Sequence, residues 1–591
     1  MDLDKIVISA HRTETDLDDA VDNIDVYSEE FLEQLPADNL GEALHYLPGV
    51  DVLINGSFGQ AKNLTIYGSQ VRHVLVAIDG IPMNTQLSGQ ANLSRLPIGI
   101  IQRIEVIKGP ASSAWGSSLG GVINVITKQA PKEDGLTGEF SASFAEHHTF
   151  KETLNLSGRS KKISYFFSGN HMISDGIKSK SRAEENKFYQ KIRYDLTDDM
   201  SVTGSFGYTG AQISDGVNPN NRWYHLPYNT RFGKLQWDTL QDEQQWHAAY
   251  KYNDQDVTTD FYHATTDALL SSTVSHNVYQ GLSLNGHRRI NPQCLLVTGV
   301  DFDWHRLKSN NYLEEAKHVA MQSPYVNLFV EKGPWSFVPG LRYDNNNRFG
   351  EQVSPSFGMV YKSLTFPDLS IQTKVSRAFN APPLLWIYNE DLAWLVAPNP
   401  DLKAERGLVY EIGIDKALTD KLDVKLNFYR ADIKDAIAVT FNGTAFQSEN
   451  FKKFRRQGVE LIWAYDFSDE WRIFGSGAFN DVENRQTKET VRDSSIARQS
   501  YQIGVNYQYQ EEWFVYLSGF YKRWSSAASL EPNDRKIILD LSVKKKIKNI
   551  FKENDLDVFL NIHNITNSKY WASINNPLPG RYFEGGCTVS F

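Results

Sequence analysis

The amino-acid sequence predicts a transmembrane antiparallel β-barrel of about 22 strands, with an N-terminal α+β plug domain inside its lumen. Three observations predict this fold class. Apolar and polar residues alternate from residue 132 to residue 591, short connections alternate with long ones there, and no apolar run approaches the roughly 18 residues of a transmembrane helix. A helical membrane protein is therefore excluded.

The predicted barrel occupies residues 132–591. Between residues 201 and 209, for example, Val202, Phe206 and Tyr208 alternate with serines and threonines, which suits a wall between lipid and water. The length allows about 21 residues for each strand with its connection, enough for a span of about 9–11 residues. Residues 230–245 fit either a further strand or a loop. A β-sandwich array or propeller would show regular repeats, and none is visible.

The part before the barrel divides into an arm and a small domain. Residues 1–23 are polar apart from one short apolar patch and predict a flexible arm. Residues 24–131 mix helix and strand patterns and predict the plug domain. Helices are expected at SEEFLEQL and DNLGEALHYLPG, and strands at VLVAIDG, QRIEVIKG and GGVINVITK.

Composition excludes several classes of function. The net charge of -10 gives no general attraction to nucleic acid, whose binding depends on Lys and Arg contacts with phosphate. The two cysteines, Cys294 and Cys587, are too few for a disulfide framework or a cysteine-based metal site. The start MDLDKIVISA lacks the basic and apolar parts of a secretion signal, so for an exported protein we expect a mature chain with an added Met1.

Ordered motifs run along the whole chain. After DKIVISA come LPGVDV, HVLVAIDGIPMN and QRIEVIKGPASSAWGSSLGGVINVITK, and later SRAFNAPPLLWIY, NPDLKAERGLVYEIGI, FRRQGVELIW, NIHNITNSKYW and PGRYF. In this order and spacing they resemble the signatures of the TonB-dependent outer-membrane receptors. The resemblance implies a protein of the bacterial outer membrane, in contact with its lipid, that transports a scarce metal-chelate nutrient and is not an enzyme.

The segment 4–10 resembles a TonB box, and the resemblance implies binding to the TonB protein of the inner-membrane energising complex. A short extended segment can add to an exposed sheet edge, with main-chain groups supplying the affinity. Its β-branched residues suit such a strand. The alternatives are the first strand of a soluble fold or a disordered tail. The predicted box consists of Asp4, Lys5, Ile6, Val7, Ile8, Ser9 and Ala10.

The resemblance also implies an electrostatic lock between plug and barrel. In the family, plug arginines meet two barrel glutamates, which by motif position are Arg103, Glu411 and Glu460 here. A second plug arginine is expected in an IRG triplet, but this chain has Tyr67 at that position. Arg72 is a possible substitute. Each of these groups could instead be an ordinary solvated charge of the lumen.

Glycines in the plug are expected to serve the backbone conformation rather than ligand binding. Those of KGPASSAWGSSLGG lack the Lys and Ser/Thr placement of a phosphate loop, so Gly109 and its neighbours are expected to allow tight turns. Asp79 followed by Gly80 predicts another turn.

The plug is most similar to that of the cobalamin receptors, so a corrinoid is the favoured ligand and a ferric siderophore the alternative. By this resemblance, plug loops 55–62 and 84–92 face outward and contact the ligand. Haem is less favoured because residues 377–402 contain no histidine, and the scattered aspartates of 170–245 offer no calcium cluster. Candidate contacts are Phe58, Gln60, Gln86, Gln90, Asn92, Trp223, Tyr224, Tyr228, Trp386 and Tyr388; the aromatics could equally belong to the interfacial girdle.

Two other classes of protein compete with a receptor. An enzyme would need a catalytic constellation, and no G-x-S-x-G, H-E-x-x-H or supported carboxylate pair is present. A passive porin would have an open lumen, whereas here an N-terminal domain is available to fill it. No catalytic residue, metal ligand or cofactor is predicted.

Overall fold

The structure is a computed structural model. It describes residues 6–7, 12, 15–54, 56, 58–129, 131, 133–218, 221–241, 243–310, 313–366, 368–389, 396–441, 443–491, 495–526, 536–551, 554–573 and 576–591. None of the helices in these ranges is both long and apolar enough to cross a membrane.

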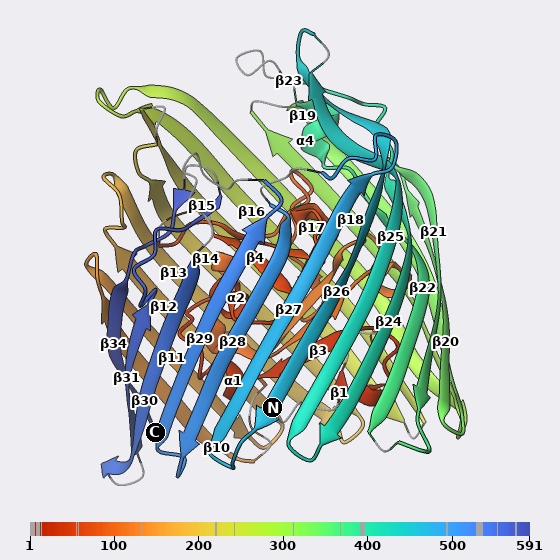
Figure 1. Ribbon diagram of the computed structural model, residues 1–591, viewed down its shortest axis with the longest axis horizontal. Helices are drawn as coiled ribbons and strands as arrows, with labels where there is room; N and C mark the ends of the chain where they lie inside the picture. The colour runs from red at the N-terminus through yellow and green to blue at the C-terminus, as the bar shows by residue number, and fades with distance from the viewer. Residues whose placement is uncertain are drawn as a thin grey trace.

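In the described part of the chain, 22 antiparallel strands form a closed barrel, confirming the predicted fold class (Figure 1). A further strand of two residues, β23 (Val396–Ala397), runs parallel to β26. The barrel strands are β10 (Gly135–Ala145), β11 (Thr149–Ser160), β12 (Ile163–Ser174), β13 (Ser181–Thr197), β14 (Met200–Asp215), β15 (Arg222–Gln241), β16 (Gln244–His263), β17 (Leu269–Asn291), β18 (Cys294–Ser309), β19 (Leu313–Lys332), β20 (Trp335–Asn346), β21 (Gly350–Lys362), β22 (Leu369–Asn380), β24 (Glu405–Thr419), β25 (Leu422–Phe441), β26 (Phe446–Asp466), β27 (Trp471–Asn484), β28 (Ala497–Tyr509), β29 (Trp513–Trp524), β30 (Ile537–Phe551), β31 (Asn554–His563) and β34 (Tyr582–Ser590).

Side-chain alternation gives the barrel an apolar outside and a polar inside. Leu282 and Leu284 are 47% and 48% exposed on the outer surface, whereas Ser283 between them is 8% exposed and faces the lumen. Because every second residue is turned toward lipid, the chain carries a membrane-facing belt despite a mean hydropathy of -0.43.

The two rims of the barrel differ. At the rim near the C-terminus the strands are joined mostly by tight turns, and at the opposite rim by longer connections (Figure 1). The longest of these, residues 381–404, contains α4 (Leu384–Tyr388). The sequence left residues 230–245 open between strand and loop; residues 230–241 belong to β15, and residues 244–245 begin β16.

The plug lies inside the barrel (Figure 1). Its sheet has the order β3-β8-β9-β6-β7, and β4 and β5 form a separate hairpin. Every residue of β9 is buried, which its apolar sequence GVINVIT explains. Asn39 caps α2 by accepting from the backbone N–H of Glu42. The elements are η1 (Leu17–Asp19), β3 (Ile24–Ser28), α1 (Glu29–Leu32), α2 (Leu40–His45), β4 (Val50–Ile54), β5 (Lys62–Ile66), η2 (Val71–His73), β6 (Val74–Ile78), β7 (Ile81–Pro82), η3 (Leu93–Arg95), η4 (Ile98–Ile100), β8 (Ile101–Lys108), α3 (Ser112–Trp115) and β9 (Gly121–Thr127).

Two short pairings complete the structure. In the arm, β1 (Ile6–Val7) pairs antiparallel with β2 (Thr15–Asp16). Ile6 and Val7 are therefore extended. That they belong to a TonB box stays a prediction, and the other five residues of the predicted box lie outside the described residues. Near the C-terminal end, β32 (Trp571–Ser573) pairs with β33 (Asn576–Pro577).

Candidate functional site: the interface between plug and barrel

A fully buried ion pair joins the plug to barrel strand β26. The Lys108 ammonium lies 2.9 Å from Glu460 Oε1, and the Tyr67 hydroxyl donates to Glu460 Oε2 at 3.0 Å. Asp25 of the plug lies 2.6 Å from the same ammonium. Because Glu460 and Lys108 have no exposed side-chain surface, each charge depends on these partners for its stability.

Tyr67 stands where the family resemblance implies an arginine. Its ring stacks on that of Tyr429, with centroids 4.2 Å apart and planes 8° apart, and the Tyr429 hydroxyl donates to the Tyr67 carbonyl at 3.0 Å. In the IRG triplet, Tyr67 therefore replaces the expected cation with a neutral hydrogen-bond donor that still contacts Glu460. Lys108 supplies the positive charge.

Arg103 does not form the predicted ion pair with Glu460 or Glu411. Its Nε lies 2.8 Å from Glu105 of the plug itself. The reason is the two-residue alternation of β8: Arg103 and Glu105 project from one face of the strand and Lys108 from the other. Among the described residues the plug cation that pairs with Glu460 is therefore Lys108, and a lock at this contact stays a prediction.

Two glycines make room for the two barrel glutamates. A Cβ built on Gly109 would lie 1.8 Å from Oε1 of Glu411, and one on Gly49 would lie 1.8 Å from Oε1 of Glu460. Both glycines have positive φ, +117° and +71°. Glu411 thus packs against the plug backbone at Gly109.

Arg72 makes a separate attachment, to Glu405 on β24. Its Nη2 lies 3.0 Å from Glu405 Oε1, and His73 Nε2 lies 2.8 Å from Oε2. The Ile437 backbone N–H donates to the same carboxylate at 2.9 Å. Burial lowers the pKa of His73 to about 4, even though Glu405 opposes that shift, so the imidazole is neutral at pH 7. Sequence reasoning missed Glu405, although it lies in the NPDLKAERG motif.

The N-terminal arm is tied to β18. Nη1 of Arg12 lies 2.8 Å and 2.7 Å from the two carboxylate oxygens of Asp301. Its guanidinium also lies 4.7 Å from the centroid of Trp115. Asp301 also pairs with Arg342, whose Nη1 lies 2.9 Å from Asp301 Oδ2. The Nε of Arg342 lies 2.8 Å from Oδ1 of Asp344. None of these charges was predicted, because nothing in the sequence places the arm beside β18.

Further ion pairs hold β3 and the residues before it. Lys425 lies 2.8 Å from Asp25, and Lys374 pairs with Asp22. The pKa of Asp25 is lowered: burial alone would raise it, but Lys108 and Lys425 outweigh that effect. These pairs lie on β22 and β25, so this side of the plug is held mainly by charge.

The loop 55–62 borders a cavity of about 120 Å³ toward the long-loop rim. The Phe58 ring meets Tyr582 edge-on at 5.5 Å, and the Tyr582 ring stacks on His563 at 4.3 Å. Gln60 is 1% exposed and its amide donates to the Ser214 carbonyl at 3.3 Å. Phe58 therefore lines an open space, whereas Gln60 serves plug attachment.

The loop 84–92 lies beneath α4. The carbonyls of Gln86 and Leu87 accept from the backbone N–H groups of Leu384 and Leu385 at 2.9 and 3.0 Å. The Asn92 side chain accepts from Ser94 and caps η3. The backbone of Gln90 pairs with Thr85 at 3.0 Å. This half of the predicted ligand floor is thus in contact with α4.

The candidate aromatics divide between lumen and outer surface. Even-numbered residues of β15 face the lumen and contact the plug. The Arg95 guanidinium lies 4.4 Å from the centroid of the Tyr228 ring, and the Tyr224 hydroxyl donates to the side-chain oxygen of Gln60 at 3.3 Å. Trp223 therefore projects outward, where it stacks on Tyr262, and this position fits the girdle interpretation. In α4, Trp386 lies 4.8 Å from the Arg72 guanidinium and Tyr388 lies 5.0 Å from the Lys317 ammonium.

One group of three metal-ligating side chains occurs in the described part of the chain. Asp254, Asp256 and His276 bring ligand atoms within 4.8 Å of one another. Arg231 lies 3.3 Å from both carboxylates, so their charge is already balanced in part.

Comparisons with known proteins agree with this geometry. Residues 137–565 match the family model described as TonB dependent receptor-like, beta-barrel, and residues 16–122 match the TonB-dependent receptor plug domain. The chain is 24% identical over 497 residues to the vitamin B12 transporter BtuB of Vibrio vulnificus, covering 79% of this chain and 78% of that one. It is also 24% identical to BtuB of Photobacterium profundum, covering 96% and 95%. The crystal structure of the siderophore receptor PirA from Pseudomonas aeruginosa matches with a TM-score of 0.75 at 19% identity, covering 96% and 99%.

Proposed function

The chain belongs to the TonB-dependent receptors of the bacterial outer membrane, and from this premise we propose that it imports a corrinoid, cobalamin or a close relative. The family consists of transporters and receptors rather than enzymes. The observation that carries the proposed substrate is the likeness to proteins named vitamin B12 transporter along nearly the whole chain.

The geometry of the plug supports an external ligand site at loop 55–62. Phe58, His45 and Tyr582 border the cavity there, and the lining mixes aromatic rings with a few polar groups. Ligand sites in proteins commonly have this composition, with apolar surface for affinity and polar groups for orientation. A corrinoid, large and rich in amides, would contact the cavity mouth and the surrounding loops.

A ferric siderophore is the second candidate, and the residues around α4 favour it. Trp386 lies against Arg72, and Tyr388 lies between Lys317 at 5.0 Å and Arg348 at 5.9 Å. Cations beside aromatic rings suit an anionic ligand that itself carries rings.

Energy for transport would come through the arm. Ile6 and Val7 are extended in the structure, and an extended segment can be captured by edge addition to a partner sheet. We propose that TonB binds the box at residues 4–10 and pulls on the arm. The attachments of Arg12 and Lys108 are then the contacts that resist the pull.

Equilibrium binding to the purified receptor in detergent tests the substrate. Cobalamin, a ferric catecholate siderophore, a ferric hydroxamate siderophore and haem would be titrated in parallel. We expect nanomolar binding of cobalamin and a loss of at least tenfold, about 1.4 kcal/mol, with Phe58→Ala. Nanomolar binding of a ferric siderophore without cobalamin binding would overturn the corrinoid proposal.

A further inference from the structure

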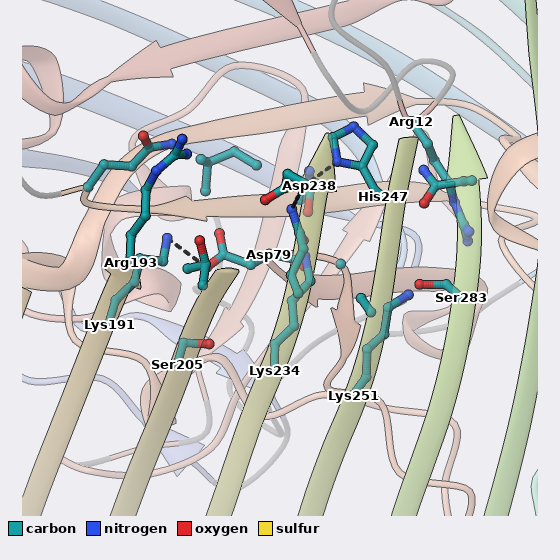
Figure 2. Close-up of a pocket in the computed structure, with 18 of the residues that line it drawn as sticks. Arg12, Asp79, Lys191, Arg193, Ser205, Lys234, Asp238, His247, Lys251 and Ser283 are labelled. Carbon is teal, nitrogen blue, oxygen red and sulfur yellow. Dashed lines mark hydrogen bonds and ion pairs between the residues drawn. The ribbon is translucent and has the colours of Figure 1, made fainter. Parts of the chain in front are cut away.

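A second cavity, of about 460 Å³, lies between the plug and the barrel wall in the half nearer the short turns. Figure 2 shows its wall, where Lys191, Ser205, Lys234, Lys251 and Ser283 project from five consecutive strands, β13 to β17. Its volume falls within the range of about 300–1,000 Å³ typical of small-molecule sites. It is separate from the cavity beside loop 55–62.

Positive charge dominates this cavity. Among its described lining residues, six carry a guanidinium or ammonium group and three carry a carboxylate. Another space, along β10 to β13 and β30 to β31, has the opposite balance, with nine carboxylates and four lysines among its described lining residues. The lumen therefore has a basic side and an acidic side, and cavities with walls of one sign concentrate ions of the other sign.

Three lysines define the basic cavity. Lys191 lies 3.0 Å from the Asp79 carboxylate, and Lys234 donates to the Asp79 carbonyl at 2.8 Å. Lys251 is 8% exposed; among the described residues its ammonium makes no hydrogen bond or ion pair, and the carboxylates of Asp301 and Asp303 act on it only through longer-range electrostatic attraction. An ammonium that is this buried and has carboxylates only at longer range is incompletely stabilised, and an anionic oxygen in the cavity would contact it directly.

The plug presents a turn to these lysines. Asp79 and Gly80 both have positive φ, +46° and +79°, and the Asp79 carboxylate accepts from the backbone N–H and the hydroxyl of Thr127 at 3.0 and 2.6 Å. A Cβ built on Gly80 would meet no atom within 4 Å, so the turn faces open space. Asp79 thus places a carboxylate of the plug at the position where Lys191 and Lys234 could bind an anion of the substrate.

The plug is also held differently on this side. Near the cavity its contacts with β16 are neutral: the amides of Asn253 and Gln255 donate to the carbonyls of Pro82 and Met83 at 2.8 and 3.1 Å. On the other side it is held by buried ion pairs such as Lys108 with Glu460. The turn itself is held by the ion pair between Lys191 and Asp79 as well as by these neutral contacts, and its displacement would break that pair and free Lys191 and Lys234.

We propose that this cavity is a binding site for an anionic oxygen group, a phosphate ester, carboxylate or catecholate, on the route of the substrate through the lumen. Lys251 offers the first contact, and Lys191 and Lys234 join it once Asp79 moves. This proposal depends on the proposed function in one respect, that a substrate crosses the lumen. It holds whether that substrate is a corrinoid or a siderophore.

Thiol modification measures the charge selectivity of the cavity without any substrate. In a background with Cys294→Ser and Cys587→Ser, Ser283→Cys places a thiol in the basic cavity and Ser542→Cys places one in the acidic space. Each would react with an anionic and a cationic methanethiosulfonate, with rates normalised to a small free thiol. We expect the anionic reagent to react about tenfold faster at position 283 and more slowly at position 542.

Lysine variants then connect the site to transport. Lys251→Gln should reduce the anionic preference at position 283 and slow uptake of radiolabelled cobalamin severalfold. Equilibrium binding at the external site beside loop 55–62 should stay unchanged. Lys251→Arg should restore the anionic preference and the uptake. Lys544→Gln, in the acidic space, is the matched control, and heat-modifiable gel migration verifies folding. Equal reagent rates at position 283, or unchanged uptake by Lys251→Gln, would overturn the proposal. A wild-type protein that takes up no cobalamin would count against the proposed substrate alone; the thiol experiment would still decide the site.

Discussion

Arg12 of the arm and Asp301 of strand β18 form a bidentate contact, with one guanidinium nitrogen 2.8 and 2.7 Å from the two carboxylate oxygens. The carboxylate is 4% exposed and is shared with Arg342. The contact connects the segment that carries the predicted TonB box to the barrel wall, so it limits how far the arm can extend.

Asp301→Asn should release the arm. The neutral amide keeps the shape of the side chain but loses the charge that holds Arg12, a loss of roughly 3 kcal/mol for a buried pair. A spin label at Val7→Cys should become more mobile. Asp303→Asn is the control, because Asp303 accepts from Tyr279 instead. Equal label mobility in wild type and Asp301→Asn would contradict the tether.

Lys108→Met should weaken plug retention more than Arg103→Met. Among the described residues, removing Lys108 leaves Glu460 buried with two neutral donors, Tyr67 and Asn427, whereas Arg103 pairs with Glu105 of the plug. Amide hydrogen exchange of β8 should be faster in the Lys108 variant, and cells should become more sensitive to a large antibiotic. The reverse order of the two variants would restore Arg103 as the lock residue.

Gly109→Ala should destabilise the plug more than Gly80→Ala. Both positions have positive φ and share a backbone penalty of about 1 kcal/mol, but only at Gly109 would the new Cβ meet Glu411. The clash should add roughly 1–3 kcal/mol. Amide hydrogen exchange of the plug strands β8 and β9 at increasing guanidinium concentration measures the difference. Equal destabilisation would mean that Glu411 can move aside freely.

Val7→Pro should abolish transport while leaving ligand affinity unchanged. Proline removes a backbone donor from the strand that TonB is proposed to capture. Val7→Thr keeps the donor and the β-branched shape and should transport normally. Uptake and equilibrium binding of the same ligand provide the two measurements. A Val7→Pro protein with normal uptake would exclude this role of the arm.

His45 should make plug stability depend on pH. Burial and the nearby Lys522 lower its pKa to about 3, from 6.5 in the unfolded chain. This contribution to stability is fully present above pH 6.5 and is lost as pH falls toward 3, because only the unfolded chain binds the proton there. The loss is about 1.4 kcal/mol per pH unit. His45→Gln should flatten the melting-temperature profile across this window, and an unchanged profile would exclude the effect.

The fold could be predicted because alternation is a local property that each strand carries in its own sequence. Leu282, Ser283 and Leu284 show the pattern without reference to any other strand. Residues 230–245 are ambiguous because Gly233 weakens the alternation, and only pairing with β14 and β16 defines residues 230–241 as strand.

The site was predicted less completely because it depends on pairings between distant residues. Glu460 followed from its motif, but its partner depends on which face of β8 each cation occupies. Arg12 and Asp301 lie 289 residues apart, and no local pattern connects them. The outward direction of Trp223 likewise follows only from Tyr228 contacting the plug.

Barrel closure orders the events of biogenesis. Strand β34 pairs with β10 from Glu139↔Ser590 to Ala145↔Glu584, and the backbone of Phe591 exchanges hydrogen bonds with Gly138 at 2.7 and 2.9 Å. This junction joins the two ends of the barrel sequence, so it can form only after the strands between them are in place. The plug precedes β10 in the chain and, once folded, is too large to pass through the closed wall. It must therefore enter the lumen from a rim of the closed barrel or be enclosed as the ring forms.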